Sequence, residues 1–130
     1  MTQEDKELLL RDLYARIPYG VIVCQVLDDG SYSGCHDVLS ASDLEDLDSF
    51  RPYLRPLESM TLKEKKEKLS LFFSVVDTKG LGLIPTLSGP KAVGYIDWLN
   101  AHHFDHRGLI EKGLALEAPE DMYKININVY

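Results

Sequence analysis

The chain of 130 residues is long enough for one domain to bury a hydrophobic core without metal ions or disulfides. Its composition, 45% hydrophobic and 27% charged, is that of an ordinary globular protein, and no apolar run approaches the roughly 20 residues that cross a bilayer. The net charge of −7 disfavours direct binding of nucleic acid, in which Lys and Arg displace counterions from phosphates. Since the start of the chain has no signal-peptide pattern either, we expect a cytoplasmic protein without a membrane segment.

The first predicted element is a helix from Gln3 to Arg16. Thr2 is a suitable N-cap, and the "IPYG" that follows ends the helix, because Pro18 disfavours helical geometry at Ile17. Helical spacing predicts a core-facing stripe of Leu9, Leu10, Leu13 and Tyr14.

A hairpin is predicted next. The run from Val21 to Leu27 is β-branched on both faces and should be covered on both sides, whereas its partner, 31–39, is more polar and nearer an edge. If Asp29 and Gly30 form a two-residue turn, the two cysteines, Cys24 and Cys35, lie directly opposite each other. We expect two reduced thiols in a cytoplasmic protein, with a disulfide as the alternative.

Two less regular segments follow the hairpin. "SASDLEDLD" indicates either a short helical turn capped by Ser40 or Ser42, or an acidic loop. In "FRPYLRPLESM" (50–60), Pro52 and Pro56 each lack a backbone donor, which favours an edge strand or an extended connector.

The second half of the chain is predicted to be mainly helical. Thr61 and Glu64 form a capping box at the start of a helix that should run to about Val76, with Gly80 beyond its end. Its predicted core side is made by Leu62, Leu69, Phe72, Phe73 and Val76.

A short extended segment at 81–87 should precede another helix, which restarts near Ser88 and Pro90. At the end of the chain, alternating apolar residues predict a last strand over 125–129.

Together these elements predict the α+β class. We expect an N-terminal helix, a small antiparallel and partly barrel-like sheet, and a helical C-terminal half whose last strand returns to the sheet. The chain should form a single domain over residues 1–130, with a β-rich half at about 17–60 and a helical half at about 61–124.

Three of the four histidines, His102, His103 and His106, lie within five positions of one another. In an unbroken helix, His102 and His106 would share a face at a spacing that allows two imidazoles to reach one zinc ion, and the chain would be a metal-dependent hydrolase. However, no third ligand is marked by spacing, so we predict no bound metal or other cofactor.

The alternative is a corner between two helices, which we favour. Asp105 would cap a second helix, Phe104 would pack inward opposite Leu109, and Gly113 would end that helix in a left-handed turn. The histidines would then be partly exposed, and they would either fill N-terminal positions of the second helix or hydrogen-bond to carbonyl groups of the preceding helix. No catalytic residue follows from this interpretation.

A protein-binding surface is the function that we predict for this corner. Aromatic and Arg side chains carry much of the energy of protein interfaces, and the corner combines them with other polar groups. The candidate residues are Asp97, Trp98, Asn100, His103, Phe104, Asp105 and Arg107. A solvated helix face beside a buried Trp is the alternative.

A third possibility is association with nucleic acid. The basic residues that could carry it are Lys63, Lys65, Lys66, Arg51 and Arg55. The net charge disfavours it, and the glutamates among the lysines predict an ordinary solvated helix face.

Two motifs carry a resemblance. "RPYLRPLESMT" (51–61) and "DWLNAHHFDHRGLIEKGLALEAPEDMY" (97–123) resemble a set of small uncharacterised proteins of gut Bacteroidales and of their phages and mobile elements. The resemblance implies an accessory role in a mobile element and transfers no catalytic residue. The expected function is therefore a non-enzymatic protein-interaction or accessory module with a protein as its partner.

Overall fold

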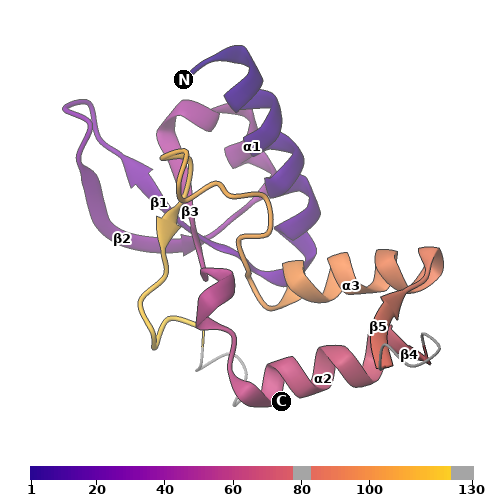
Figure 1. Ribbon diagram of the computed structural model, residues 1–130. Coiled ribbons are helices and arrows are strands. Elements are labelled where there is room, and N and C mark those ends of the chain that lie inside the picture. The colour runs from indigo at the N-terminus through magenta and orange to yellow at the C-terminus, as the bar shows by residue number, and fades with distance from the viewer. Residues whose placement is uncertain (78–82, 124–130) are drawn as a thin grey trace.

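The computed structural model describes residues 1–77 and 83–123, and its elements form a body and a helical arm (Figure 1). The body comprises the helix α1 (Gln3–Arg16) and a four-stranded sheet, and the arm comprises the helices α2 (Leu62–Phe72) and α3 (Gly89–Ala101) with the strands β4 (Phe73–Asp77) and β5 (Leu83–Leu87) between them. The α+β class is confirmed. No helix in the described residues combines the length and the apolar character needed to cross a bilayer.

Helix α1 has the predicted bounds. The Thr2 hydroxyl accepts a hydrogen bond from the Asp5 amide at 3.1 Å, and the short helix η1 (Ile17–Tyr19) follows, ending at Gly20 with φ of 69°. The predicted core stripe was partly wrong, since Tyr14 is 61% exposed. The buried side consists of Leu9, Asp12, Leu13 and Arg16, because Asp12 and Arg16 neutralise each other inside the body.

The sheet has the strand order β2-β1-β3-β6 and is mixed. Strand β1 (Ile22–Val26) is antiparallel both to β2 (Tyr32–Val38) and to β3 (Phe50–Leu54), whereas β3 and β6 (Leu116–Glu117) are parallel. Strand β2 lies at an edge, as predicted. Strand β6 returns the C-terminal part of the described chain to the sheet, and the strand predicted at 125–129 lies outside the described residues.

The predicted register of the hairpin is wrong. The loop contains three residues, 28–30, because the Leu27 amide donates to the Ser31 carbonyl at 2.8 Å and Gly30 adopts φ of 85°. An irregularity between Cys24 and Val26 then shifts the pairing again, so Cys24 lies opposite His36 and not opposite Cys35. Cys24 is a buried free thiol, as expected for that residue.

The segment before β3 is helical, as one of the two alternatives predicted. Helix η2 (Ala41–Glu45) is capped by Ser40 with Asp43, and η3 (Leu47–Ser49) follows. Strand β3 is central, which corrects the expected edge position. Its proline is tolerated because β6 pairs only with Tyr53 and Leu54, beyond Pro52.

Helix α2 begins at the predicted capping box but ends at Phe72, short of the predicted Val76. The short helix η4 (Leu57–Ser59) precedes it. The aromatic and β-branched run from Phe73 forms a ladder with β5 instead, and β5 lies within the extended segment predicted at 81–87. The residue expected just beyond the helix, Gly80, lies outside the described residues.

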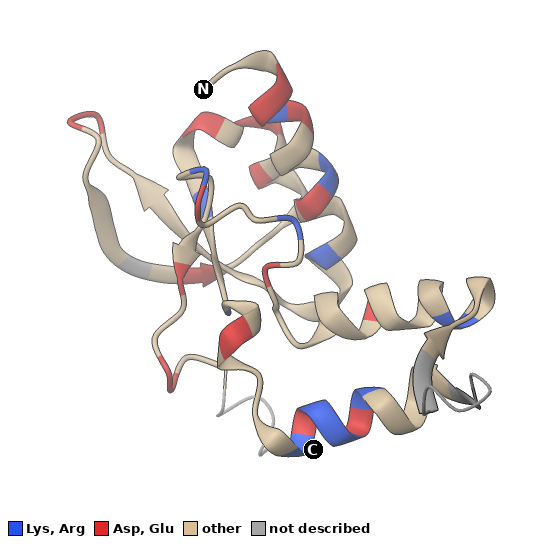
Figure 2. Cartoon of the chain, in the orientation of Figure 1, with Lys and Arg blue, Asp and Glu red and all other residues tan. Residues whose placement is uncertain are grey.

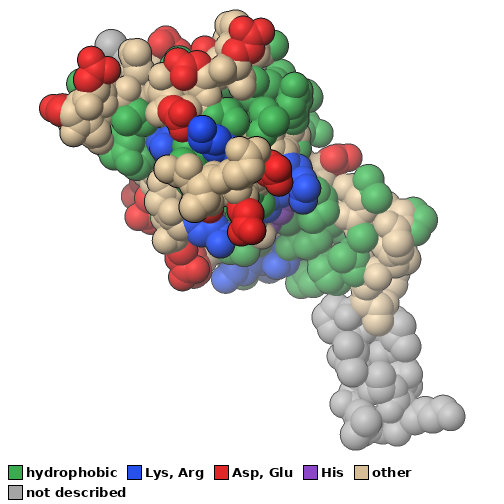
Figure 3. Space-filling view, turned by 90° about the horizontal axis from the view of Figure 1, so that it is seen from above, with side chains coloured by type: hydrophobic (Ala, Val, Ile, Leu, Met, Phe, Trp, Pro, Cys, Tyr) green, Lys and Arg blue, Asp and Glu red, His purple; other side chains and the backbone are tan. Residues whose placement is uncertain are grey.

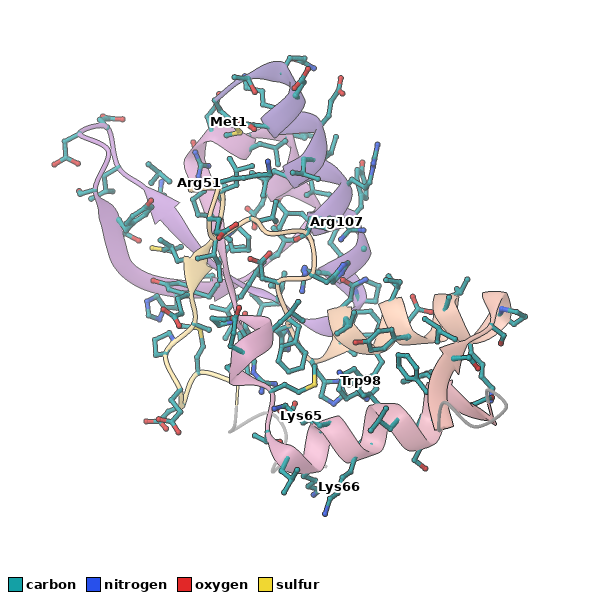
Figure 4. The ribbon with its side chains drawn as sticks, viewed as in Figure 1. Met1, Arg51, Lys65, Lys66, Trp98 and Arg107 are labelled. Atoms are coloured by element: carbon teal, nitrogen blue, oxygen red, sulfur yellow. The ribbon has the colours of Figure 1, made fainter. Side chains whose placement is uncertain are left out.

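Two hydrophobic clusters stabilise the body and the arm. In the body, α1 packs on the sheet, and the cluster consists of Leu9, Leu13, Val21, Val23, Leu39, Leu54, Leu109, Leu114 and Ala115. In the arm, the cluster consists of Met60, Trp98, Leu99 and Phe104, with Phe72 and Tyr95 at its margin. Trp98 lies between α3 and α2 (Figure 4). The segment after α3, which contains the histidines, joins the two clusters.

Candidate functional site: the histidine corner and the helical arm

The chain turns sharply just after the end of α3, at His103, two residues earlier than the predicted break at Asp105. The His103 amide donates to the Asn100 carbonyl at 3.1 Å, and the Phe104 amide donates to the Leu99 carbonyl at 2.9 Å. This pair of bonds is a Schellman motif, in which the residue after the cap adopts a left-handed conformation. Here that residue is His103, with φ of 63°, a conformation that glycine usually supplies.

Arg55 holds the corner against the end of β3. Its amide donates to the His103 carbonyl at 2.7 Å, and its carbonyl accepts from the Asp105 amide at 2.8 Å. Its guanidinium lies 4.2 Å from the centre of the Phe104 ring and donates to the His102 carbonyl at 3.2 Å. The corner is therefore fixed by backbone and side chain together.

Asp105 caps backbone amides as predicted, although no helix follows it. Its carboxylate accepts from the amides of Leu109 and Ile110 at 2.8 and 3.0 Å, and the segment continues as turns up to Gly113, which has the predicted positive φ, 73°. The expected packing of Phe104 on Leu109 is not formed, because Phe104 belongs to the arm cluster and Leu109 to the body cluster.

The three histidines make separate contacts. His102 Nδ1 lies 2.9 Å from the Trp98 carbonyl oxygen, which fixes the proton on Nδ1, and His106 Nε2 lies 2.8 Å from Asn100 Oδ1. His103 is buried and stacks on Tyr123 with 3.7 Å between ring centres. The prediction of partial exposure therefore holds for two of the three and is wrong for His103. In the part of the chain that the structure describes, no three His, Cys, Asp or Glu side chains gather in a way that could hold a metal ion.

Burial keeps two of these imidazoles neutral. Burial and the nearby Arg16 lower the pKa of His103 from 6.5 to about 3. Burial, with Arg16 and Arg107 close by, lowers the pKa of His106 from 6.5 to about 4, against the opposing effect of Asp12 and Asp105. Both imidazoles are therefore neutral, with one ring N–H each, near neutral pH.

A buried ionic network connects α1 to the corner. The Asp12 carboxylate accepts from Arg16 Nε at 2.7 Å and from Arg107 Nη1 at 2.8 Å, and Arg16 Nη2 donates to the Phe104 carbonyl at 2.6 Å. Both Asp12 and Arg16 have fully buried side chains. Arg16 Nη1 and His103 Nδ1 are the two buried side-chain atoms, among the described residues, that have no hydrogen-bond partner.

The predicted partner-binding residues divide into two groups. Trp98, Asn100, His103 and Phe104 are buried, so they belong to the interior and offer no contact surface. Asp97 is exposed, whereas Asp105 and Arg107 are partly buried and bonded internally. The corner thus supports the fold, and of the seven predicted residues Asp97 is the one that is exposed.

A cleft lies beside the corner, between the start of α2 and the segment after β6. It has a volume of about 480 Å³, within the usual range for ligand pockets. Its walls include Arg55, Glu64, Glu67, His102 and Tyr123. These five side chains all make internal hydrogen bonds, and the cleft is also lined by the charged residues Lys63, Glu117 and Glu120.

Three internal hydrogen bonds orient helix α2. Arg55 donates to both carboxylate oxygens of Glu64, at 2.7 and 2.8 Å, and the Trp98 indole donates to Glu67 at 2.9 Å. Burial alone would raise the pKa of Glu64, but the bonds from Arg55 and Thr61 lower it below its usual value. Both acids of α2 therefore face inward.

The opposite side of α2 faces solvent and carries leucines that were predicted to lie in the core. Leu62 is 68% exposed and Leu69 is 45% exposed, which corrects that prediction for both residues. Phe72 lies at the margin of the arm cluster, as expected, and the side chain of Val76 lies outside the described part of the chain. Lys65 and Lys66 are exposed on the same side, and Lys66 points away from α3 (Figure 4). Basic residues are denser on α2 than on any other helix (Figure 2).

No protein-family model matches this chain, and neither a curated protein nor a solved structure is similar to it. The functional interpretation therefore depends on the contacts described above.

Proposed function

We propose that the chain is a non-enzymatic protein-interaction module, with an accessory role in a phage or mobile element, and that it contacts its partner through the helical arm. The observation that carries the proposal is the apolar surface that the arm leaves in solvent. Val93 is 65% exposed on α3, and Leu62, Leu69 and Leu71 are exposed on α2. Hydrophobic side chains are visible along the arm next to the body in Figure 3.

A contiguous apolar patch in solvent is typical of a surface that another protein covers, whereas single exposed apolar side chains are ordinary. Five of the exposed large hydrophobic residues belong to the two helices of the arm: Leu62, Leu69, Leu71, Val93 and Ile96. The helices are short and rest on a small cluster, so further burial against a partner would also stabilise the arm.

The contacts of the histidines support an architectural role over hydrolysis. His102 and His106 each use a ring nitrogen for an internal hydrogen bond, and His103 is stacked inside the molecule on Tyr123. A zinc hydrolase would need such nitrogens to converge on one open position.

The proposal is tested by affinity capture of the full chain from cells that carry its gene. We expect wild-type protein to capture a defined set of proteins that Val93→Ser/Ile96→Ser or Leu62→Ser/Leu69→Ser loses. Val38→Ser on β2 is the matched control, since Val38 is 60% exposed but lies on the body. A photo-crosslinker at position 93 or 69 should label the same proteins, and one at position 38 should not.

Capture that is equal for the wild type and both arm variants would contradict the proposal. Stoichiometric zinc binding that depends on His102 and His106 would favour the hydrolase instead.

A further inference from the structure

Helix α2 presents a continuous outward face, which we define as Leu62, Lys65, Lys66 and Leu69. These residues are spaced i, i+3, i+4 and i+7, so they lie on one side of a helix over two turns, about 10 Å. All four are exposed. The face therefore has an apolar residue at each end and two ammonium groups between them.

The orientation of this face is imposed by the interior. Glu64 is fixed by two hydrogen bonds to Arg55, and Glu67 by one to the Trp98 indole, from positions on the other side of the helix. Rotating α2 to bury Leu62 and Leu69 would break these bonds, and it would leave the Arg55 guanidinium without its carboxylate and the Trp98 indole N–H without an acceptor. The outward face is consequently a fixed feature of the folded chain.

The same arrangement separates charge. Helix α2 contains four lysines and two glutamates and therefore has a net charge of +2. Because the whole chain has a net charge of −7, the rest of the chain has a net charge of −9. The two glutamates are engaged internally, and within the described residues no lysine of α2 forms an ion pair. Acidic side chains are distributed around the body (Figure 3). The outward face is thus a basic and apolar surface on an acidic protein.

We propose that the outward face of α2 binds an acidic segment of a partner protein that also carries apolar residues, such as an amphipathic helix with Glu or Asp beside Leu. This inference rests on the proposed function and names the chemistry of the partner. The lysines complement carboxylates, and leucines seven residues apart match the apolar stripe of a helix laid along α2.

Charge also argues against the other polyanions. A duplex or an anionic bilayer extends well beyond the 10 Å face and would meet the −9 charge of the remaining chain. A duplex would also leave the exposed leucines unburied. A short acidic segment avoids both problems, because it covers the face without reaching the acidic body.

The test uses the purified full chain and a labelled synthetic helix of about five turns, with Leu on one stripe and Glu on both sides of it, followed by fluorescence anisotropy. We expect saturable binding that Lys65→Glu/Lys66→Glu weakens at least about ten-fold, with a smaller effect at high salt. Leu62→Ser/Leu69→Ser should weaken binding by a similar factor. Trp98 fluorescence and the urea midpoint verify that each variant is folded.

Matched controls separate the face from general charge effects. Arg11→Glu/Lys112→Glu changes the net charge by the same amount at exposed positions of the body and should alter binding less than about two-fold. A polyglutamate peptide without apolar residues should bind at least about ten-fold more weakly than the amphipathic probe. Equal weakening by both charge reversals, or equal binding of both peptides, would overturn the inference.

Duplex DNA and vesicles of phosphatidylcholine with phosphatidylglycerol are the competing probes. Tighter binding of either through Lys65 and Lys66 would show that the partner class is wrong. If arm variants lose cellular partners while the acidic helix fails to bind the purified chain, this inference fails and the proposed function stands. If the acidic helix binds through α2 but no cellular partner depends on the arm, the proposed function fails.

Discussion

Helices α1 and α2 place opposite kinds of residue inside the molecule. Helix α1 buries two leucines together with the Asp12–Arg16 pair, whereas α2 turns its two glutamates inward and leaves Leu62 and Leu69 in water. In both helices a polar contact with a distant residue decides the orientation. In α1 the polar contact turns the apolar stripe inward, and in α2 the polar contacts turn the apolar stripe toward solvent.

The magnitudes explain how the opposed case is possible. Burying an exposed leucine gains about 1.5–3 kcal/mol. Leaving a buried donor without an acceptor costs about 1–3 kcal/mol, and more for a charged group such as Arg55. The glutamates of α2 accept hydrogen bonds from both Arg55 and Trp98. The free energy that these bonds protect is therefore similar to the free energy that burial of the leucines would gain, and the glutamates can determine which side of α2 faces inward. The comparison shows that α2 leaves apolar side chains in solvent in order to keep buried donors hydrogen-bonded. In α1 the buried leucines and the buried ion pair lie on the same side, so no such conflict arises.

The largest effect should come from breaking the buried pair in the body. Asp12→Asn leaves the charge of Arg16 buried without a counterion, and we expect a loss of about 3–5 kcal/mol in the free energy of unfolding. Urea titration followed by circular dichroism measures it. The control is Asp48→Asn, which removes the exposed ion pair with Lys6 and should cost less than about 1 kcal/mol. Equal effects would mean that the pair in the body is not desolvated.

The two kinds of leucine give the most direct comparison. Leu13→Ala in α1 should lower the free energy of unfolding by about 2–5 kcal/mol, since Leu13 is 1% exposed. Leu62→Ala in α2 should change it by less than about 0.5 kcal/mol. Urea midpoints of the two variants decide the point. A large loss for Leu62→Ala would show that α2 packs differently in solution.

Acid should destabilise the molecule through the corner that joins body and arm. Burial and the nearby Arg16 lower the pKa of His103 from 6.5 to about 3 in the folded state. Between these two pH values the unfolded state therefore binds more protons than the folded state. The contribution of neutral His103 to the free energy of unfolding is therefore present above pH 6.5 and is lost as the pH falls. Between pH 7 and pH 5 we expect a loss of about 2 kcal/mol. His106 should add to the loss, since its pKa is also lowered.

Urea titrations at several pH values test this dependence. His103→Phe should make the loss between pH 7 and pH 5 smaller, whatever its effect on stability at pH 7. An unchanged slope in His103→Phe would contradict the buried position of this imidazole.

The smallest effect concerns the bond that orients α2. Glu67→Leu removes the acceptor of the Trp98 indole, and we expect a loss of about 1–3 kcal/mol together with a shift in the emission of the only Trp. Lys66→Leu, on the outward face, is the control and should leave the emission unchanged. If Glu67→Leu is neutral in both measurements, α2 is not held by this bond.

Local patterns in the sequence were sufficient for much of the fold. Thr2 and the Thr61–Glu64 box marked two helix starts, and the β-branched run at 21–27 marked the central strand, because caps and periodicity depend only on neighbouring residues. The same locality explains why Asp105 was recognised as a capping residue and Gly113 as a left-handed turn.

Only the tertiary structure decided which faces are buried and where the chain bends. The register of the hairpin depended on a three-residue loop, and the end of α2 on a strand partner more than ten residues away. The inward glutamates required Arg55 and Trp98, and the left-handed His103 required Arg55 from another element. Contacts between residues that are distant in the chain leave no local pattern in the sequence. Composition and local patterns therefore determined an acidic α+β protein, whereas long-range polar contacts determined the surface that it presents.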